Sequence, residues 1–167
     1  MKLGVVAAVG VIGLVYGISA YGKSSAPAEV WNPCTGISDD ALLAAGLDPA
    51  TRDSGIPQPR DSGRAICRWA APRYAYTVTV FSTAEAAIEL AHESGSFGWR
   101  DVTIAARPGR RFEVAGPSAH RNCHVLFPAH HGVLQISVAI EFGDTDRVSA
   151  CERLESVGQA LVPVLPE

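Results

Sequence analysis

The sequence contains very little lysine, and this limits the kinds of partner it can bind. Of its 167 residues only Lys2 and Lys23 are lysines, so residues 29–167 carry 12 arginines against 17 acidic residues, a net charge of −5. Proteins that bind nucleic acid concentrate positive charge on one surface. The acidic balance therefore argues against a nucleic-acid partner.

The sequence also lacks the short motifs that indicate common catalytic and cofactor sites. It has no G-x-S-x-G nucleophile turn, no phosphate-binding loop, no dinucleotide fingerprint and no H-E-x-x-H metal motif. It has no C-x-x-C pair of the kind that four-cysteine zinc sites contain. We therefore expect no enzymatic activity, no catalytic residues, no cofactor and no metal ligands.

The longest stretch without charge lies at the N-terminus. Residues 3–22 form 20 uncharged positions between two lysines, long enough to cross a bilayer as a helix. Residues 26–28, Ala-Pro-Ala, suit a signal peptidase, whereas typical secretory apolar regions run only about 7–15 residues. We predict that residues 1–28 are a signal peptide or a signal-anchor helix with a short tether. Residues 29–167 then form one extracytoplasmic domain, attached to the membrane through residues 3–22 if these are not cleaved.

Export changes how the four cysteines are interpreted. An even number of cysteines outside the cytoplasm predicts disulfides. Three pairings are possible, and we favour Cys34 with Cys67 and Cys123 with Cys151, which staples each half of the chain separately. Each loop of about 30 residues would contribute about 3–4 kcal/mol through the entropy of the unfolded chain.

A very short helix after the first cysteine carries clear start and stop signals. Ser38 can cap it, and Asp39 and Asp40 lie in the first turn, where the helix dipole favours negative charge. Gly46 supplies the left-handed residue that ends it. So short a helix is unstable by itself, and we expect the bridge at Cys34 to attach it to the domain.

The rest of the chain alternates between strand and helix patterns. We expect strands over 64–70, 74–81, 99–106, 110–116, 123–129 and 133–141. We expect one helix over 82–94 and a second that begins at a cap on Asp144 or Thr145 and ends at about residue 162. Residues 48–63 are predicted to form a loop. The connections are too short for repeated parallel crossovers. The predicted fold is α+β: an antiparallel sheet of about five or six strands, with helices packed mainly on one face and stapled by disulfides.

A histidine-rich segment offers the main alternative function. It contains His120, His124, His130 and His131 around Cys123, and histidine and cysteine are good metal ligands where their side chains converge. Strand geometry opposes convergence, because adjacent residues point to opposite faces. The spacing of Ser118 and His120 matches no catalytic template, and we interpret it as a turn.

Tryptophan and arginine residues provide further candidates for recognition. Trp69 alternates with Cys67 and should pack beside the first disulfide, whereas Trp31 and Trp99 could line a groove or lie at a membrane surface. The turn expected around Pro108-Gly109 carries Arg107, Arg110 and Arg111. It could contact an acidic lipid or a glycan phosphate, but we expect a solvated basic turn.

The chain resembles a family of actinobacterial secreted or lipid-anchored proteins classed as domain of unknown function three-five-five-eight. The matching segments are Asn32-Pro33-Cys34, Gly46-Leu47, Cys67-Arg68-Trp69, Cys123-His124-Val125, Ala150-Cys151 and Leu165-Pro166. The resemblance implies a cell-envelope location and no established activity. Many members carry a lipid-accepting cysteine directly after the leader, but here no cysteine precedes Cys34, so we expect a retained helix rather than lipidation.

We conclude from the sequence that this is a non-enzymatic protein of the cell envelope, an accessory module that binds a ligand or partner. The expected partner is a membrane protein, a cell-wall protein or a small apolar ligand. The alternative is an envelope hydrolase or metalloprotein built on the histidines between His120 and His131.

Overall fold

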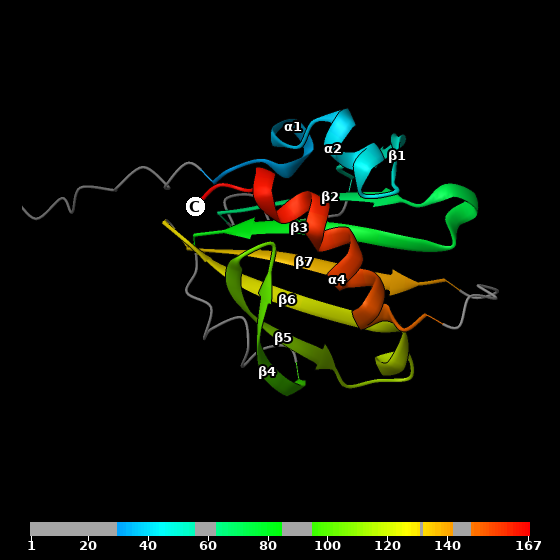
Figure 1. The fold of residues 1–167 in the computed structure, drawn as a ribbon, viewed down its shortest axis with the longest axis vertical. Coiled ribbons are helices and arrows are strands. Elements are labelled where there is room, and N and C mark those ends of the chain that lie inside the picture. The colour runs from blue at the N-terminus through cyan, green and yellow to red at the C-terminus, as the bar shows by residue number, and fades with distance from the viewer. Residues whose placement is uncertain (1–29, 56–62, 85–94, 131, 142–147) are drawn as a thin grey trace, which may run out of the picture.

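The computed structural model describes residues 30–55, 63–84, 95–130, 132–141 and 148–167. These residues form a seven-stranded antiparallel sheet in the order β1-β2-β3-β7-β6-β5-β4, with the longest helix, α4, lying across one face (Figure 1). The predicted antiparallel sheet with disulfides is confirmed. Its strand count is corrected from five or six to seven.

The elements follow one another along the chain with short connections. The strands are β1 (Asp48–Asp53), β2 (Arg64–Ala70), β3 (Tyr76–Thr83), β4 (Ser96–Ile104), β5 (Arg107–Val114), β6 (Asn122–Ala129) and β7 (Gly132–Ile140). The helices are α1 (Pro33–Gly36), α2 (Asp39–Ala44) and α4 (Ala150–Leu161), with single 3-10 turns η1 (Pro72–Tyr74), η2 (Ala119–Arg121) and η3 (Val162–Val164).

The inner face of the sheet, which faces α4, forms the hydrophobic core. Val78 lies opposite Val138, and Val80 lies opposite Ile136; all four side chains are fully buried. The apolar side of α4 covers them with Leu154, Val157 and Leu161, which are at most 2% exposed. Strict alternation along β3 and β7 therefore produces one dry face.

The outer face of the sheet carries a cross-strand row of polar and aromatic residues. Arg68 is opposite Thr79, Thr79 is opposite Ser137, Ser137 is opposite His124, and His124 is opposite Phe112. Residues directly opposite each other in antiparallel strands share a face and interact. The row crosses five strands, from β2 to β5.

The two disulfides join the cysteines in the pairing that the sequence favours. Cys34 in α1 is bonded to Cys67 in β2, and Cys123 in β6 is bonded to Cys151 in α4. Trp69 is fully buried in the same core cluster as Cys67, as predicted. Each bridge therefore attaches a helix to the sheet.

The short helix predicted after Cys34 is present as α2. The Ser38 side chain accepts a hydrogen bond from the backbone N–H of Ala41, and Gly46 ends the helix with φ +76°. The backbone N–H of Leu47 then bonds back to the carbonyl of Leu42. The helix begins and ends where its capping residues predict.

The loop expected over 48–63 is wrong at its start, because β1 occupies its first six residues. This edge strand has an irregular register with β2, and a side chain replaces part of the backbone ladder: the N–H of Ala70 donates to Oγ1 of Thr51 at 2.8 Å. Pro49 and this side-chain bond explain why the strand pattern is weak in sequence.

Two predicted helix starts are also wrong. Ser82 and Thr83 belong to β3, where they pair with Leu134 and Val133; the rest of the helix expected over 82–94 lies outside the described residues from position 85 on. Helix α4 begins at a capping box between Ser149 and Glu152, not at Asp144 or Thr145. A reciprocal cap satisfies two free N–H groups.

The turn expected around Pro108-Gly109 lies earlier, at Ala105 and Ala106, while Pro108 and Gly109 belong to β5. A Cβ on Gly109 would come within 2.8 Å of the carbonyl oxygen of Leu126. Glycine is therefore needed here for the close approach of β6, and not for the turn.

None of the helices in the described ranges has both the length and the apolar character needed to cross a bilayer. Residues 1–28 lie outside these ranges, and the leader stays a prediction.

The β4–β5 turn should become more stable when its alanines are replaced. Ala105 and Ala106 both have positive φ, 47° and 67°, a conformation that costs an L-residue about 1–2 kcal/mol and that Asn-Gly adopts readily. We expect the double variant Ala105→Asn, Ala106→Gly to raise the free energy of unfolding by about 0.5–1 kcal/mol. This net gain is the relief of the positive-φ cost minus the backbone entropy that the new glycine loses on folding. Urea unfolding measures the change in the free energy of unfolding. The control Ala115→Gly, at an ordinary φ, should lower stability; a loss in both variants would contradict the strain argument.

Removing each bridge should loosen a different part of the domain. We expect the pair Cys34→Ser, Cys67→Ser to raise amide exchange over residues 33–47 while β7 stays protected. The pair Cys123→Ser, Cys151→Ser should raise exchange in α4 and be the more damaging, because α4 covers the core. Each loss should be about 3–4 kcal/mol at most, measured by hydrogen exchange. Equal exchange changes from both variants would contradict separate attachment.

Candidate functional site

A stack of three rings extends across strands β4, β5 and β6 on the outer face. The ring centroids of Trp99 and Phe112 are 4.4 Å apart, and those of Phe112 and His124 are 5.0 Å apart, both in stacked geometry. Trp99 alternates with Asp101 along β4, which brings both to the same face. The stack ends at the edge strand, where Trp99 is partly exposed.

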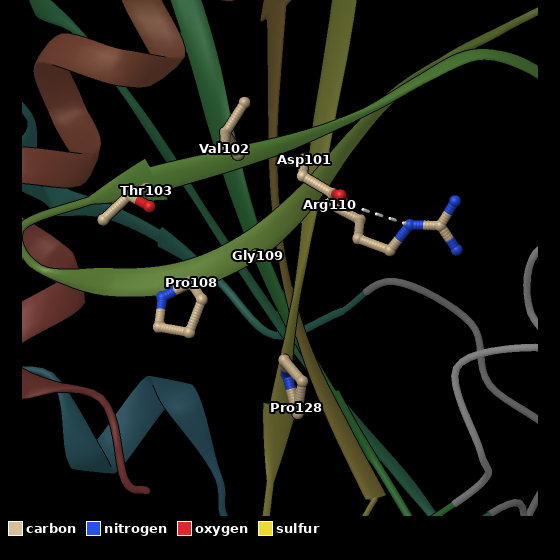
Figure 2. Close-up of a pocket in the computed structure, with 7 residues that line it drawn as sticks. All are labelled: Asp101, Val102, Thr103, Pro108, Gly109, Arg110 and Pro128. Carbon is tan, nitrogen blue, oxygen red and sulfur yellow. Dashed lines mark ion pairs between the residues drawn. The ribbon is translucent and has the colours of Figure 1, made fainter.

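Arg110 is held beside this stack by two interactions. Its guanidinium carbon lies 4.9 Å from the centroid of the Trp99 ring, and its Nε lies 3.5 Å from Oδ1 of Asp101. Figure 2 shows its two terminal nitrogens pointing away from Asp101. Because both charged side chains are more than half exposed, at 62% and 93%, each contact contributes less than about 1 kcal/mol. The contacts orient Arg110 more than they stabilise the fold.

A groove of about 450 Å³ adjoins Arg110, a volume within the range of small-molecule sites. It is lined by Asp101, Val102, Thr103, Pro108, Gly109, Arg110 and Pro128 (Figure 2). Pro108 comes from β5 and Pro128 from β6, and their rings supply apolar walls. Thr103 adds one hydroxyl group. The groove therefore combines an apolar lining with an oriented cation at its rim.

His124 lies in a small hydrogen-bonded cluster on the outer face, at the end of the ring stack that is farthest from the edge strand β4. Its Nδ1 is 2.7 Å from Oγ of Ser137, and that oxygen accepts a hydrogen bond from Nε2 of Gln135 at 2.7 Å. Its Nε2 is buried without a hydrogen-bond partner. Burial lowers the pKa of His124 to about 4, so the imidazole is neutral at pH 7 and the cluster carries no charge.

The histidines of the predicted alternative site lie on different elements. His120 belongs to η2, His124 faces outward from β6, and His130 lies at the β6–β7 corner, where its backbone N–H donates to the carbonyl of Glu167; His131 is outside the described residues. Ser118 accepts a hydrogen bond from Arg121, not from His120. In the described part of the chain no group of three or more His, Cys, Asp or Glu residues is placed to hold a metal ion.

The three arginines expected in one solvated turn are separated by the structure. Arg107 donates to the carbonyl of Pro128 at 2.7 Å, and Arg111 reaches Glu155 of α4 at 2.8 Å on the inner face. Arg110 alone joins the groove. The sequence points to Arg110 only as one of three arginines in a turn. It does not separate Arg110 from the other two because Asp101 and Trp99, which orient it, lie on the neighbouring strand, although alternation along β4 does place those two on one face.

Fold and site together define a disulfide-stapled α+β domain with an aromatic and arginine-bearing outer face. The chain belongs to the family DUF3558, described as a protein of unknown function, whose family model matches residues 19–164. No curated protein and no solved structure shows a significant match to the chain.

The partly buried His124 predicts a loss of stability in mild acid. Histidine in an unfolded chain has a pKa of about 6.5, whereas that of His124 in the fold is about 4. The unfolded state therefore gains the proton first as pH falls. The stability that depends on neutral His124 is complete above pH 6.5 and is lost progressively as the pH falls to 4, by up to about 3 kcal/mol.

Urea unfolding at a series of pH values between 7 and 4 measures this loss. The variant His124→Gln should flatten the pH dependence, because glutamine does not titrate. The control His120→Gln, at an exposed histidine, should keep the full dependence. The same slope in H124Q and in the wild type would show that His124 is not its source.

Proposed function

We propose that this protein is a non-enzymatic binding module of the cell envelope, and that its ligand contacts the groove beside Arg110. The observation that carries the proposal is the position of Arg110, held by Trp99 and Asp101 at the rim of a groove with proline walls. A side chain oriented before binding loses less entropy when a ligand arrives.

The chemistry of the groove suits a small ligand with an apolar body and one anionic group. The rings of Pro108 and Pro128 offer apolar surface, and the free edge of Arg110, which Figure 2 shows directed away from the two proline rings, presents two donors beyond the rim to a carboxylate or phosphate. The volume of the groove lies within the range of small-molecule sites. A small amphipathic ligand of the envelope is therefore favoured over a partner protein at this position.

Two features support an extracytoplasmic location. Both disulfides belong to a class of bonds that forms and persists in oxidising compartments. The uncharged stretch over residues 3–22 has the length of a membrane-crossing helix. We propose that the domain lies outside the cytoplasm, anchored by this segment or released after its cleavage.

The hydrogen bond between Ser137 and His124 is the observation that favours a hydrolase as the second candidate. A serine nucleophile needs a base that is oriented in turn by a third group. Nε2 of His124 has no hydrogen-bond partner, and Gln135 already donates to the serine oxygen. The binding function is therefore the better supported of the two.

Calorimetric titration of the full-length protein with decanoate, decyl phosphate and neutral decanol tests the binding proposal. We expect one or both anions to bind, decanol to bind at least about tenfold more weakly, and Arg110→Gln to remove this preference, as loss of a charge-assisted hydrogen bond predicts. The control Arg100→Gln changes an exposed arginine on the adjacent strand and should bind like the wild type. Equal affinity for anions and decanol, or unchanged binding by R110Q, would contradict the proposal.

A further inference from the structure

A second cleft, of about 580 Å³, lies at the opposite edge of the sheet from the Arg110 groove. Strands β1, β2 and β3 and the turn between β2 and β3 contribute to it, and its polar lining includes Thr51, Asp53, Arg68 and Glu141. The two sites share no lining residue. Whatever this cleft binds is therefore independent of the function proposed for the groove.

The turn at the rim of this cleft has an unusual backbone. Arg73 and Tyr74 both have positive φ, 59° and 56°, a conformation that bulky L-residues rarely adopt. Hydrogen bonds hold the turn in place: the N–H of Tyr74 donates to the carbonyl of Ala71, and the N–H of Ala71 donates to the carbonyl of Tyr76, each at 2.9 Å. The turn leaves Tyr74 64% exposed at the cleft.

The four charges in the cleft are balanced in sign, and two of them form an ion pair. Arg68 donates to Asp53 at 2.6 Å, and Asp53 also accepts from the backbone N–H of Gly55 at 2.8 Å. The backbone of Glu141 is held at the cleft by its N–H, which donates to the carbonyl of Ala75. With Arg73, the lining carries two cations and two anions. Such a cleft offers many donors and acceptors without selecting a ligand of either charge.

We propose that this cleft binds a neutral saccharide. The exposed ring of Tyr74 provides a flat apolar surface for the C–H face of a sugar ring. Arg68 and Arg73 can donate to hydroxyl oxygens, and Asp53 and Glu141 can accept from hydroxyl hydrogens. An apolar ligand would desolvate these four charged groups without compensation, and a charged ligand would be attracted by two of them and repelled by the other two, with no net preference.

Calorimetric titration of the full-length protein, in a detergent that carries no sugar, tests this site. The probes are neutral oligosaccharides of glucose, galactose, mannose and N-acetylglucosamine. At least one should bind with a Kd of about 1 mM or lower, with no dependence on salt, since a neutral ligand has no charge to screen. Tyr74→Ala should weaken that binding about tenfold or more, whereas Tyr74→Phe, which keeps the ring, should bind normally.

Matched variants separate this site from the groove. Glu141→Gln and Asp53→Asn should each weaken saccharide binding, and Arg110→Gln should leave it unchanged. Thermal unfolding of each variant checks that the domain is intact. The proposal is overturned if no neutral oligosaccharide binds with a Kd of about 1 mM or lower, if Y74A binds as the wild type does, or if only charged sugars bind with strong salt dependence.

Discussion

The contact between helix α4 and the inner face of the sheet is the interaction on which the rest of the structure depends. Leu154, Val157 and Leu161 are almost completely buried against the central strands, and Gly158 allows close approach, since a Cβ there would lie 2.7 Å from Ile104. The disulfide from Cys151 fixes the helix to β6. Burial of this apolar surface makes one face of the sheet the core.

Because the core lies on the inner face, polar and recognition chemistry is concentrated on the outer face. The ring stack that ends at Trp99 and the groove beside Arg110 use side chains from strands whose alternate residues build the core, and the cleft adds Arg73 and Tyr74 from the turn between β2 and β3. A rigid sheet holds such side chains more precisely than a loop would. The two proposed sites lie toward opposite edges, β4 and β1, so that two ligands could bind without competing.

Local patterns predicted those elements whose signals are contained within a few residues. Alternation identified β6 and β7, and the capping residues identified α2. The same reasoning failed for β1, which depends on the Thr51 side chain bonding to a residue 19 positions away. It also misplaced the β4–β5 turn, because alanine is a poor indicator of positive φ and Pro108-Gly109 is a good one. Of the residues at the candidate site, the sequence points to Trp99 as a possible groove residue and to Arg110 as one of three arginines in a basic turn, but it does not pair the two.

The sequence by itself determined the acidic balance, the uncharged leader, the disulfide-bonded character of the domain and the alternation that divides each main strand into two faces. These properties follow from composition, spacing and the two-residue period of a strand. The tertiary structure alone decided which strands are neighbours, and so which side chains meet. Arg110 contacts Trp99 and Asp101, and Tyr74 meets Asp53 and Glu141 at one cleft, because sheet pairing joins residues that no local pattern connects.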